Sequence, residues 1–288
     1  PERKLVVIDS LCSSSGYGLL VDGAADLRDA GKSMDEIADW TMAMRQNVHH
    51  QFYSTELKFY RRSGRMSGGR YSGIAPGCDL VMVKVLDRRG NGYSSDVLAG
   101  ISWILERKEK LGIRILNISV GACSKRGMSE NSALVKGVNR AWDAGLVVVV
   151  AAGNNGPRTM SITTPGISRK VITVGCSDDD REVLVGGNRM VDYSGRGPTA
   201  ACICKPDLVA PGCSVVSCSS RADKYTIKSG TSMSTPIVSG AVALLLERFP
   251  DMSNKDVKLR LRESSVDIGL PRNQQGWGLL DVGKMIGK

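Results

Sequence analysis

Apolar runs alternate with amphipathic segments along the whole sequence from residue 74 onwards. The longest run, LVVVVAA (146–152), has the length of a buried strand and is far shorter than the roughly 20 apolar residues that cross a membrane. Strands that are apolar throughout and are joined by helices belong to parallel sheets covered on both faces. The sequence therefore predicts an α/β fold with a mostly parallel central sheet.

The predicted elements of this region follow one another without an internal repeat. Strands are expected at residues 79–87, 113–121, 146–154 and 170–178. Helices are expected at residues 94–110, 129–145 and 234–249. The last of these helices is apolar nearly all round, so it should be buried.

The first part of the chain has a different organisation. LVVIDS (5–10) predicts a strand that delivers Asp9 to the carboxyl end of a sheet, where α/β proteins place their chemistry. A helix is expected over residues 19–30, and SMDE (33–36) has the form of a capping box that opens another. The Gly- and Ser-rich stretch SGRMSGGRYSG (63–73) is the expected boundary, which divides the chain into residues 1–66 and 67–288.

Charge and cysteine content argue against several classes of function. Residues 1–69 carry equal numbers of acidic and basic side chains, so the net charge of +10 lies in the remainder. The basic stretch 61–70 lacks the interleaved aromatic residues of a nucleic-acid surface. Eight cysteines scattered through a large chain favour reduced thiols, and Cys202 and Cys204 alone are a weak metal signal. We therefore expect no nucleic acid, no membrane and no bound metal.

The start of the sequence bears on its location. No charged and then apolar leader precedes the first strand, which favours a cytoplasmic protein. The first residue is Pro1 rather than Met, however, which is consistent with an incomplete or processed start.

The stretch SGTSMSTPIVSGAVALLL (229–246) is the most specific in the chain. Ser232 stands among small residues just ahead of a buried helix, with Pro236 near the helix start, where its missing N–H costs little. Such a position exposes a hydroxyl beside free backbone N–H groups, as nucleophilic catalysis requires. A serine-rich helix N-cap fits this stretch equally well.

Seven segments, one of which lies within this stretch, decide between these readings. They are GIAPGCDLVMVKVLDRRGNGYSSDVLAGISWI (73–104), LNISVG (116–121), VVVAAGNNGP (148–157), YSGRGPT (193–199), KPDLVAPG (205–212), SGTSMSTP (229–236) and GWGLLDV (276–282). In this order they resemble the subtilisin-like serine proteases, over residues 64–288. The resemblance implies that family's three-layer fold and a peptide or protein substrate in extended conformation. It leaves calcium binding open, and no calcium site is identifiable in the sequence.

The resemblance implies roles for particular residues. Ser232 matches the nucleophile, and Asn154 matches the asparagine that donates to the oxyanion together with the Ser232 N–H. The remaining matches line the substrate on its two sides and in the specificity pocket: Gly90, Asn91, Gly92, Ser119, Val120, Gly121, Ala152 and Gly153. The two edges would hold the peptide backbone by β-augmentation.

The resemblance fails where the family places its other two catalytic residues. A catalytic serine needs a histidine and a carboxylate, and the chain has only His49 and His50. The chain order Asp9, His50, Ser232 is that of the family. The family's acid is followed by a Thr/Ser-Gly turn and its base opens a small-residue helix, and neither pattern is present here. Counting back from GGRYSGIAP places the family's base position near Phe52.

Residues 4–67 resemble another family, the DegV-type fatty-acid-binding proteins. The matching patterns are VIDSLCSSSGYG (7–18), DAGKS (29–33), HHQF (49–52) and LKFYRRSGRMS (57–67). This resemblance implies that the protease's N-terminal strands are replaced by a DegV-like α/β segment, and it accounts for Asp9, His49 and His50 without a catalytic role. The elements that hold a fatty-acid head group in that family are missing.

Five readings remain open. We favour a serine endopeptidase whose activity is impaired by the loss of its Asp/His segment. The alternatives are a peptide-binding pseudoprotease and a non-functional chimera, with a working triad of Asp9, His49 or His50, and Ser232 also possible on chain order. A fatty-acid-binding protein is favoured least, since neither head-group element is present.

Overall fold

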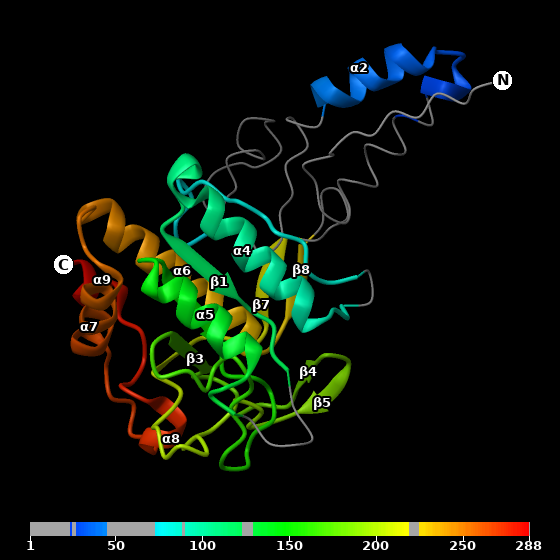
Figure 1. Ribbon diagram of the computed structural model, residues 1–288. Coiled ribbons are helices and arrows are strands. Elements are labelled where there is room, and N and C mark those ends of the chain that lie inside the picture. Colours follow the sequence, from blue (N-terminus) through cyan, green and yellow to red (C-terminus); the bar gives the residue numbers. More distant parts are fainter. Residues whose placement is uncertain are drawn as a thin grey trace.

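The computed structural model describes residues 24, 27–44, 73–87, 90–122, 129–218 and 225–287. In these ranges a parallel sheet forms the centre of the molecule, and its strand order is β1-β2-β3-β6 (Figure 1). The strands are β1 (Ile115–Ile118), β2 (Val147–Ala151), β3 (Ile172–Cys176) and β6 (Leu208–Ala210). The predicted α/β fold with a mostly parallel sheet is confirmed.

Helices cover both faces of this sheet. α4 (Ser94–Leu111) and α5 (Ala133–Asp143) lie side by side on one face, and α6 (Thr231–Arg248) packs along the other (Figure 1). α7 (Asn254–Ser264), α8 (Arg272–Gln275) and α9 (Val282–Ile286) follow in the C-terminal part. α6 contacts all four strands of the sheet, so the helix as a whole is anchored on it.

Two antiparallel hairpins lie outside the central sheet. β4 (Val183–Val185) pairs with β5 (Asn188–Met190), and β7 (Val215–Cys218) pairs with β8 (Tyr225–Lys228). The second hairpin leads directly into α6, so it ends beside the helix start.

The core lies between the sheet and its helices. Residues Val148, Val149 and Val150 of β2 have no exposed surface, as expected for an apolar strand with a helix layer on each face. Burying a side chain of this size contributes roughly 1.5–3 kcal/mol. The run that was most apolar in the sequence is therefore the centre of the fold.

The expected strand at residues 79–87 is wrong. These residues form no strand, and Leu80, Val81 and Met82 are each about two-fifths exposed. Val83 and Val85 approach Gly100 of α4, so one side of the segment packs as a strand would. A strand also needs a hydrogen-bonded neighbour, and β1 has no second partner among the described residues.

The N-terminal predictions are tested only in part. α2 (Met34–Met44) begins with the expected capping box, in which the Ser33 N–H donates to Glu36 Oε2 at 2.8 Å and the Glu36 N–H to Ser33 Oγ at 3.3 Å. The strand at 5–10 and the boundary between residues 66 and 67 lie outside the described residues. Nowhere in the described ranges is a helix both long and apolar enough to cross a membrane.

Candidate active site

Ser232 lies in the first turn of α6. Gly230 precedes the helix with φ 139°, a conformation that favours glycine, and its N–H donates to the Gly212 carbonyl at 2.9 Å. The first N–H groups of a helix have no acceptor within it, so the backbone here can donate to a ligand. The Ser232 side chain is half-buried. The structure thus gives this serine the surroundings expected of a nucleophile.

The Ser232 hydroxyl is oriented by the central sheet. Its Oγ donates to the carbonyl oxygen of Ser119 at 2.8 Å. Ser119 directly follows β1, which places Ser232 at the carboxyl end of the parallel strands. This is the edge at which α/β proteins bind and transform their ligands.

Asn154 is held beside the same helix turn. Its Oδ1 accepts from the Thr231 N–H at 2.9 Å and from Thr231 Oγ1 at 3.0 Å. Thr231 Oγ1 in turn accepts from the Gly153 N–H at 3.1 Å. Because the amide oxygen has two donors, the Nδ2 group is the part of Asn154 available to a ligand. An NH₂ fixed in this way is a preorganised donor for a developing negative charge.

The two pocket-lining segments converge on one side chain. A Cβ added to Gly121 would lie 2.5 Å from Thr163 Oγ1, and one added to Gly153 would lie 2.4 Å from Thr163 Cγ2. The Thr163 N–H donates to the Ala152 carbonyl at 2.8 Å, and the backbones of Ala122 and Thr164 exchange two hydrogen bonds. Residues 119–121 and 152–154 are therefore joined through residues 163–164.

The other expected substrate edge forms a turn. The Asn91 N–H donates to Asp87 Oδ1 at 2.9 Å and the Asp87 N–H to the Asn91 carbonyl at 2.7 Å. The turn borders a hollow of about 420 Å³ whose lining includes Lys84, Tyr93 and Asp96. Among the described residues, no hydrogen bond joins Gly90, Asn91 or Gly92 to Ser232 or Asn154.

A buried thiol lies beneath the start of α6. Cys176 has no exposed surface, and its Sγ lies 2.9 Å from the position of a Cβ added to Gly212. Burial raises the pKa of this thiol to about 12. Cys176 therefore stays protonated at neutral pH and is a poor nucleophile.

The remaining triad candidates are not placed. Asp9, His49 and His50 lie outside the described residues, so their positions relative to Ser232 stay predictions. Within the described ranges, no group of three or more His, Cys, Asp and Glu side chains could hold a metal ion. Cys202 and Cys204 are both exposed, and Cys204 Sγ contacts the Arg272 carbonyl at 3.3 Å.

The sequence profile of the Subtilase family matches residues 42–278. This chain belongs to the subtilase family. The profile of the DegV family of uncharacterised proteins matches residues 1–71, so the two matches overlap over residues 42–71. The subtilase match thus reaches further towards the N-terminus than the motifs, which ended near residue 64.

Relatives of this subtilase align with 70% or more of the chain. Serine protease AprX of Bacillus subtilis (strain 168) is 39% identical over 220 residues, which are 70% of this chain and 50% of AprX. Subtilisin DY of Bacillus licheniformis is 34% identical over 212 residues, covering 73% of this chain and 69% of that protein. The chain spans about half the length of AprX and of the thermostable alkaline protease of Halalkalibacterium halodurans.

Solved structures agree with this assignment. Sphericase has a TM-score of 0.61 at 32% identity, and the match covers 73% of this chain and 71% of that one. The S41 psychrophilic protease has the same TM-score and coverage at 30% identity. The predicted subtilisin-like fold of the subtilase part is therefore confirmed.

Sequence reasoning missed two residues of this site. Thr231 orients Asn154, and its position between Gly230 and Ser232 in a motif already singled out was the signal available. The Thr163 side chain lies between the two pocket segments and contacts both. Nothing in its local sequence distinguishes it from other buried threonines. Thr231 contacts a residue more than 35 positions away, and Thr163 contacts glycines, which carry no side chain. A local sequence pattern reveals neither kind of contact.

Proposed function

We propose that this subtilase domain binds peptide or protein segments in extended conformation, with Ser232 as nucleophile, and hydrolyses them at a strongly reduced rate. The observation that carries the proposal is the joint position of Ser232 and Asn154 at the carboxyl edge of the sheet, each fixed by hydrogen bonds. Ser232 Oγ would attack the substrate carbonyl carbon. The resulting oxyanion would accept from the Ser232 N–H and from Asn154 Nδ2.

Substrate binding would use backbone groups on both sides of the serine. Ser119, Val120 and Gly121 would pair with one edge of an extended peptide, and Gly90, Asn91 and Gly92 with the other. Ala152 and Gly153 would border the pocket for the side chain next to the cleaved bond. This chemistry uses protein groups alone, so the proposal includes no cofactor and no metal.

The proposed low rate follows from the absence of a proton acceptor for Ser232 among the described residues. In the described residues the Ser232 hydroxyl donates to a backbone carbonyl, which accepts a hydrogen bond but is too weak a base to take the proton. His49 and His50 are the only histidines of the chain, and their surrounding sequence lacks the small residues of the family's base segment. Loss of one triad member typically leaves only about 1,000- to 10,000-fold acceleration over water.

The N-terminal segment belongs to the same proposal. Residues 1–66 resemble part of a DegV protein, and we propose that this segment replaces the family's first strands without supplying a base. β1 has no second partner among the described residues, and LVVID (5–9) has the length and apolar character of such a neighbour. The segment would not bind a fatty acid, since it lacks a polar clamp for the carboxylate.

A serine-directed fluorophosphonate probe tests the proposal. We expect slow labelling that disappears in Ser232→Ala and is unchanged in His50→Ala and His49→Ala. An extended peptide should bind to the wild type and to Ser232→Ala alike. Fast labelling that either histidine variant abolishes would establish a working triad. An absence of both labelling and peptide binding would favour a non-functional chimera. A co-purifying fatty acid would favour lipid binding.

A further inference from the structure

The Thr163 side chain lies between the two pocket segments, residues 119–121 and 152–154. A Cβ added to Gly121 would come within 2.5 Å of Thr163 Oγ1, and one added to Gly153 within 2.4 Å of Thr163 Cγ2. Atoms this close would overlap, so the backbones of both glycines are already in van der Waals contact with Thr163. This one side chain therefore spans the distance from one segment to the other.

Hydrogen bonds hold Thr163 in this position. Its N–H donates to the Ala152 carbonyl at 2.8 Å, and its Oγ1 donates to the same oxygen at 3.3 Å. The next residue, Thr164, forms an antiparallel backbone bridge with Ala122. A β-branched side chain has few allowed rotamers, and here its hydroxyl is bonded as well. Thr163 is thus tied to one pocket segment directly and to the other through its neighbour.

The interior behind Thr163 gives it no room to retreat. Thr163 itself is only 5% exposed. Ile162, Ile167, Ala152 and Val135 form a buried cluster next to it, and none of them is more than 3% exposed. Protein interiors are close-packed, so moving Thr163 inwards would force these side chains out of their rotamers. A ligand that reached Thr163 would meet a rigid surface.

The position of Thr163 limits the depth of the specificity pocket. Gly121 and Gly153 have no side chains, so the space between the two segments would be an open slot if it held nothing else. Thr163 fills that space, and its hydroxyl is already paired with the Ala152 carbonyl. A methyl group fits above a filled floor, whereas a benzyl group would need the volume that Thr163 occupies.

We propose that Thr163 closes the specificity pocket, so that the residue whose carbonyl Ser232 attacks must have a small side chain, as alanine does. This inference rests on the proposed function, because it concerns an extended peptide bound beside Ser232. It adds the substrate class: segments with a small residue immediately before the reacting bond are bound productively, and segments with an aromatic residue there are not.

Two peptidyl diphenyl phosphonates test the proposal in the full chain. They share one peptide sequence and differ only in the group next to phosphorus, which is methyl in one and benzyl in the other. Ser232 Oγ attacks phosphorus and phenol leaves with the hydroxyl proton, so the new O–P bond fixes which side chain faces the pocket. The ratio of the two labelling rates is the readout, since the low reactivity of Ser232 affects both probes equally.

We expect the methyl probe to label the wild type about 10- to 100-fold faster than the benzyl probe, the range typical of discrimination by a filled pocket. Thr163→Ala removes the Oγ1 and Cγ2 atoms that fill the slot, so the benzyl probe should then react at least as fast as the methyl probe. Thr163→Val is the matched control. It keeps the volume and loses the hydroxyl, so it should keep the wild-type ratio.

Equal rates of the two probes with the wild type would overturn the proposal, and so would a ratio that Thr163→Ala leaves unchanged. A Thr163→Val ratio equal to that of Thr163→Ala would assign the selectivity to the hydroxyl rather than to the filled volume. If Thr163→Ala does not fold, Thr163→Ser removes the methyl group alone and must lower the ratio. Labelling by a simple fluorophosphonate but by neither peptidyl probe would contradict the proposed peptide binding itself.

Discussion

A hydrogen bond joins Ser232 to Ser119: the Ser232 hydroxyl donates to the Ser119 carbonyl oxygen at 2.8 Å. The bond fixes the rotamer of the hydroxyl and keeps it at the carboxyl edge of β1. It does not activate the hydroxyl, because a serine becomes a strong nucleophile only when a base takes its proton. Orientation and activation are therefore separate properties of this serine.

The pH dependence of Ser232 labelling distinguishes the two. Without a general base, hydroxide must remove the proton, so the logarithm of the labelling rate should rise linearly from pH 6 to pH 9. A histidine base would instead give a rise that levels off above its pKa, which is about 6.5 for an unperturbed imidazole. Labelling reactions with a fluorophosphonate are quenched at set times, and mass spectrometry gives the labelled fraction at each pH. A plateau that vanishes in His50→Ala would contradict the proposed impairment.

Asn154 should have separable structural and chemical roles. Asn154→Asp keeps an oxygen that accepts from Thr231 but loses the Nδ2 donor. We expect its thermal midpoint to equal that of the wild type while its labelling rate falls by about 100- to 1,000-fold, the range known for loss of such a donor in a subtilisin. The labelling rate of Asn154→Ala should fall by the same factor. Its thermal midpoint should also be lower than that of the wild type, because the Thr231 N–H loses its acceptor.

Measurement of both variants separates the roles. Equal labelling by Asn154→Asp and wild type would show that the Nδ2 group does not reach the oxyanion. A midpoint lowered equally in both variants would show that the Thr231 contacts require the neutral amide.

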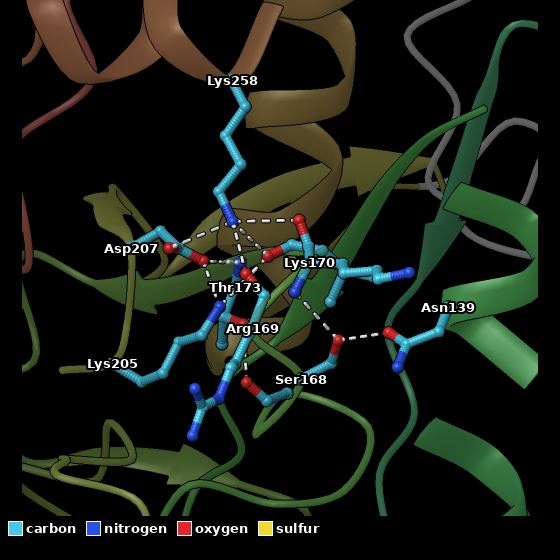
Figure 2. Close-up of polar contacts among 10 residues, drawn as sticks. Asn139, Ser168, Arg169, Lys170, Thr173, Lys205, Asp207 and Lys258 are labelled. Atoms are coloured by element: carbon cyan, nitrogen blue, oxygen red, sulfur yellow. Dashed lines mark hydrogen bonds and ion pairs between the residues drawn. The ribbon is translucent and has the colours of Figure 1, made fainter. Parts of the chain in front are cut away.

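The central sheet and the candidate residues Ser232 and Asn154 could be recognised in the sequence for the same reason. Ser232 and Asn154 lie in short motifs whose function requires particular neighbours, and the apolar run of β2 has only one stable environment. The segment 79–87 was mispredicted as a strand because its apolar pattern describes side-chain burial, whereas a strand also needs a hydrogen-bonded partner from elsewhere in the chain. The contacts of Lys258 (Figure 2) were missed because three of its four oxygen partners are backbone carbonyls, which have no sequence signature.

Gly153 should tolerate no side chain because Thr163 occupies the space. A Cβ at Gly153 would lie 2.4 Å from Thr163 Cγ2, whereas one at Gly145 would meet nothing within 4 Å. The two glycines have similar positive φ angles, 95° and 90°, so the backbone strain of an alanine is matched. We expect Gly153→Ala to lower the free energy of unfolding in urea by about 1–3 kcal/mol more than Gly145→Ala.

A double-mutant cycle with Thr163→Ala checks the cause. Removal of the Thr163 hydroxyl and methyl groups relieves the closest contacts, so Gly153→Ala should cost less in that background. An equal cost in both backgrounds would show that the contact with Thr163 is not the cause of the loss.

Lys205 should make stability depend on pH in the alkaline range. Burial lowers the pKa of this lysine from 10.5 to about 8, the Asp207 carboxylate opposes the shift, and the nearby Lys258 charge adds to it. Below pH 8 both the folded and the unfolded chain hold the proton, and the fold carries the full cost of the buried charge. Between pH 8 and 10.5 only the unfolded chain holds it, so the free energy of unfolding should rise with pH.

Urea unfolding at several pH values between 7.5 and 10.5 measures this rise by comparison with Lys205→Met. The free energy of unfolding of the wild type should rise relative to that of the variant by up to about 1 kcal/mol per pH unit, because over this range the unfolded chain holds nearly one proton more than the folded chain. Lys170→Met is the control, since it removes an exposed lysine that pairs with Asp143 at the surface and should leave the pH slope of the wild type unchanged. A difference between wild type and Lys205→Met that stays constant with pH would mean that the buried ammonium keeps an ordinary pKa, held by Asp207 against the effect of burial.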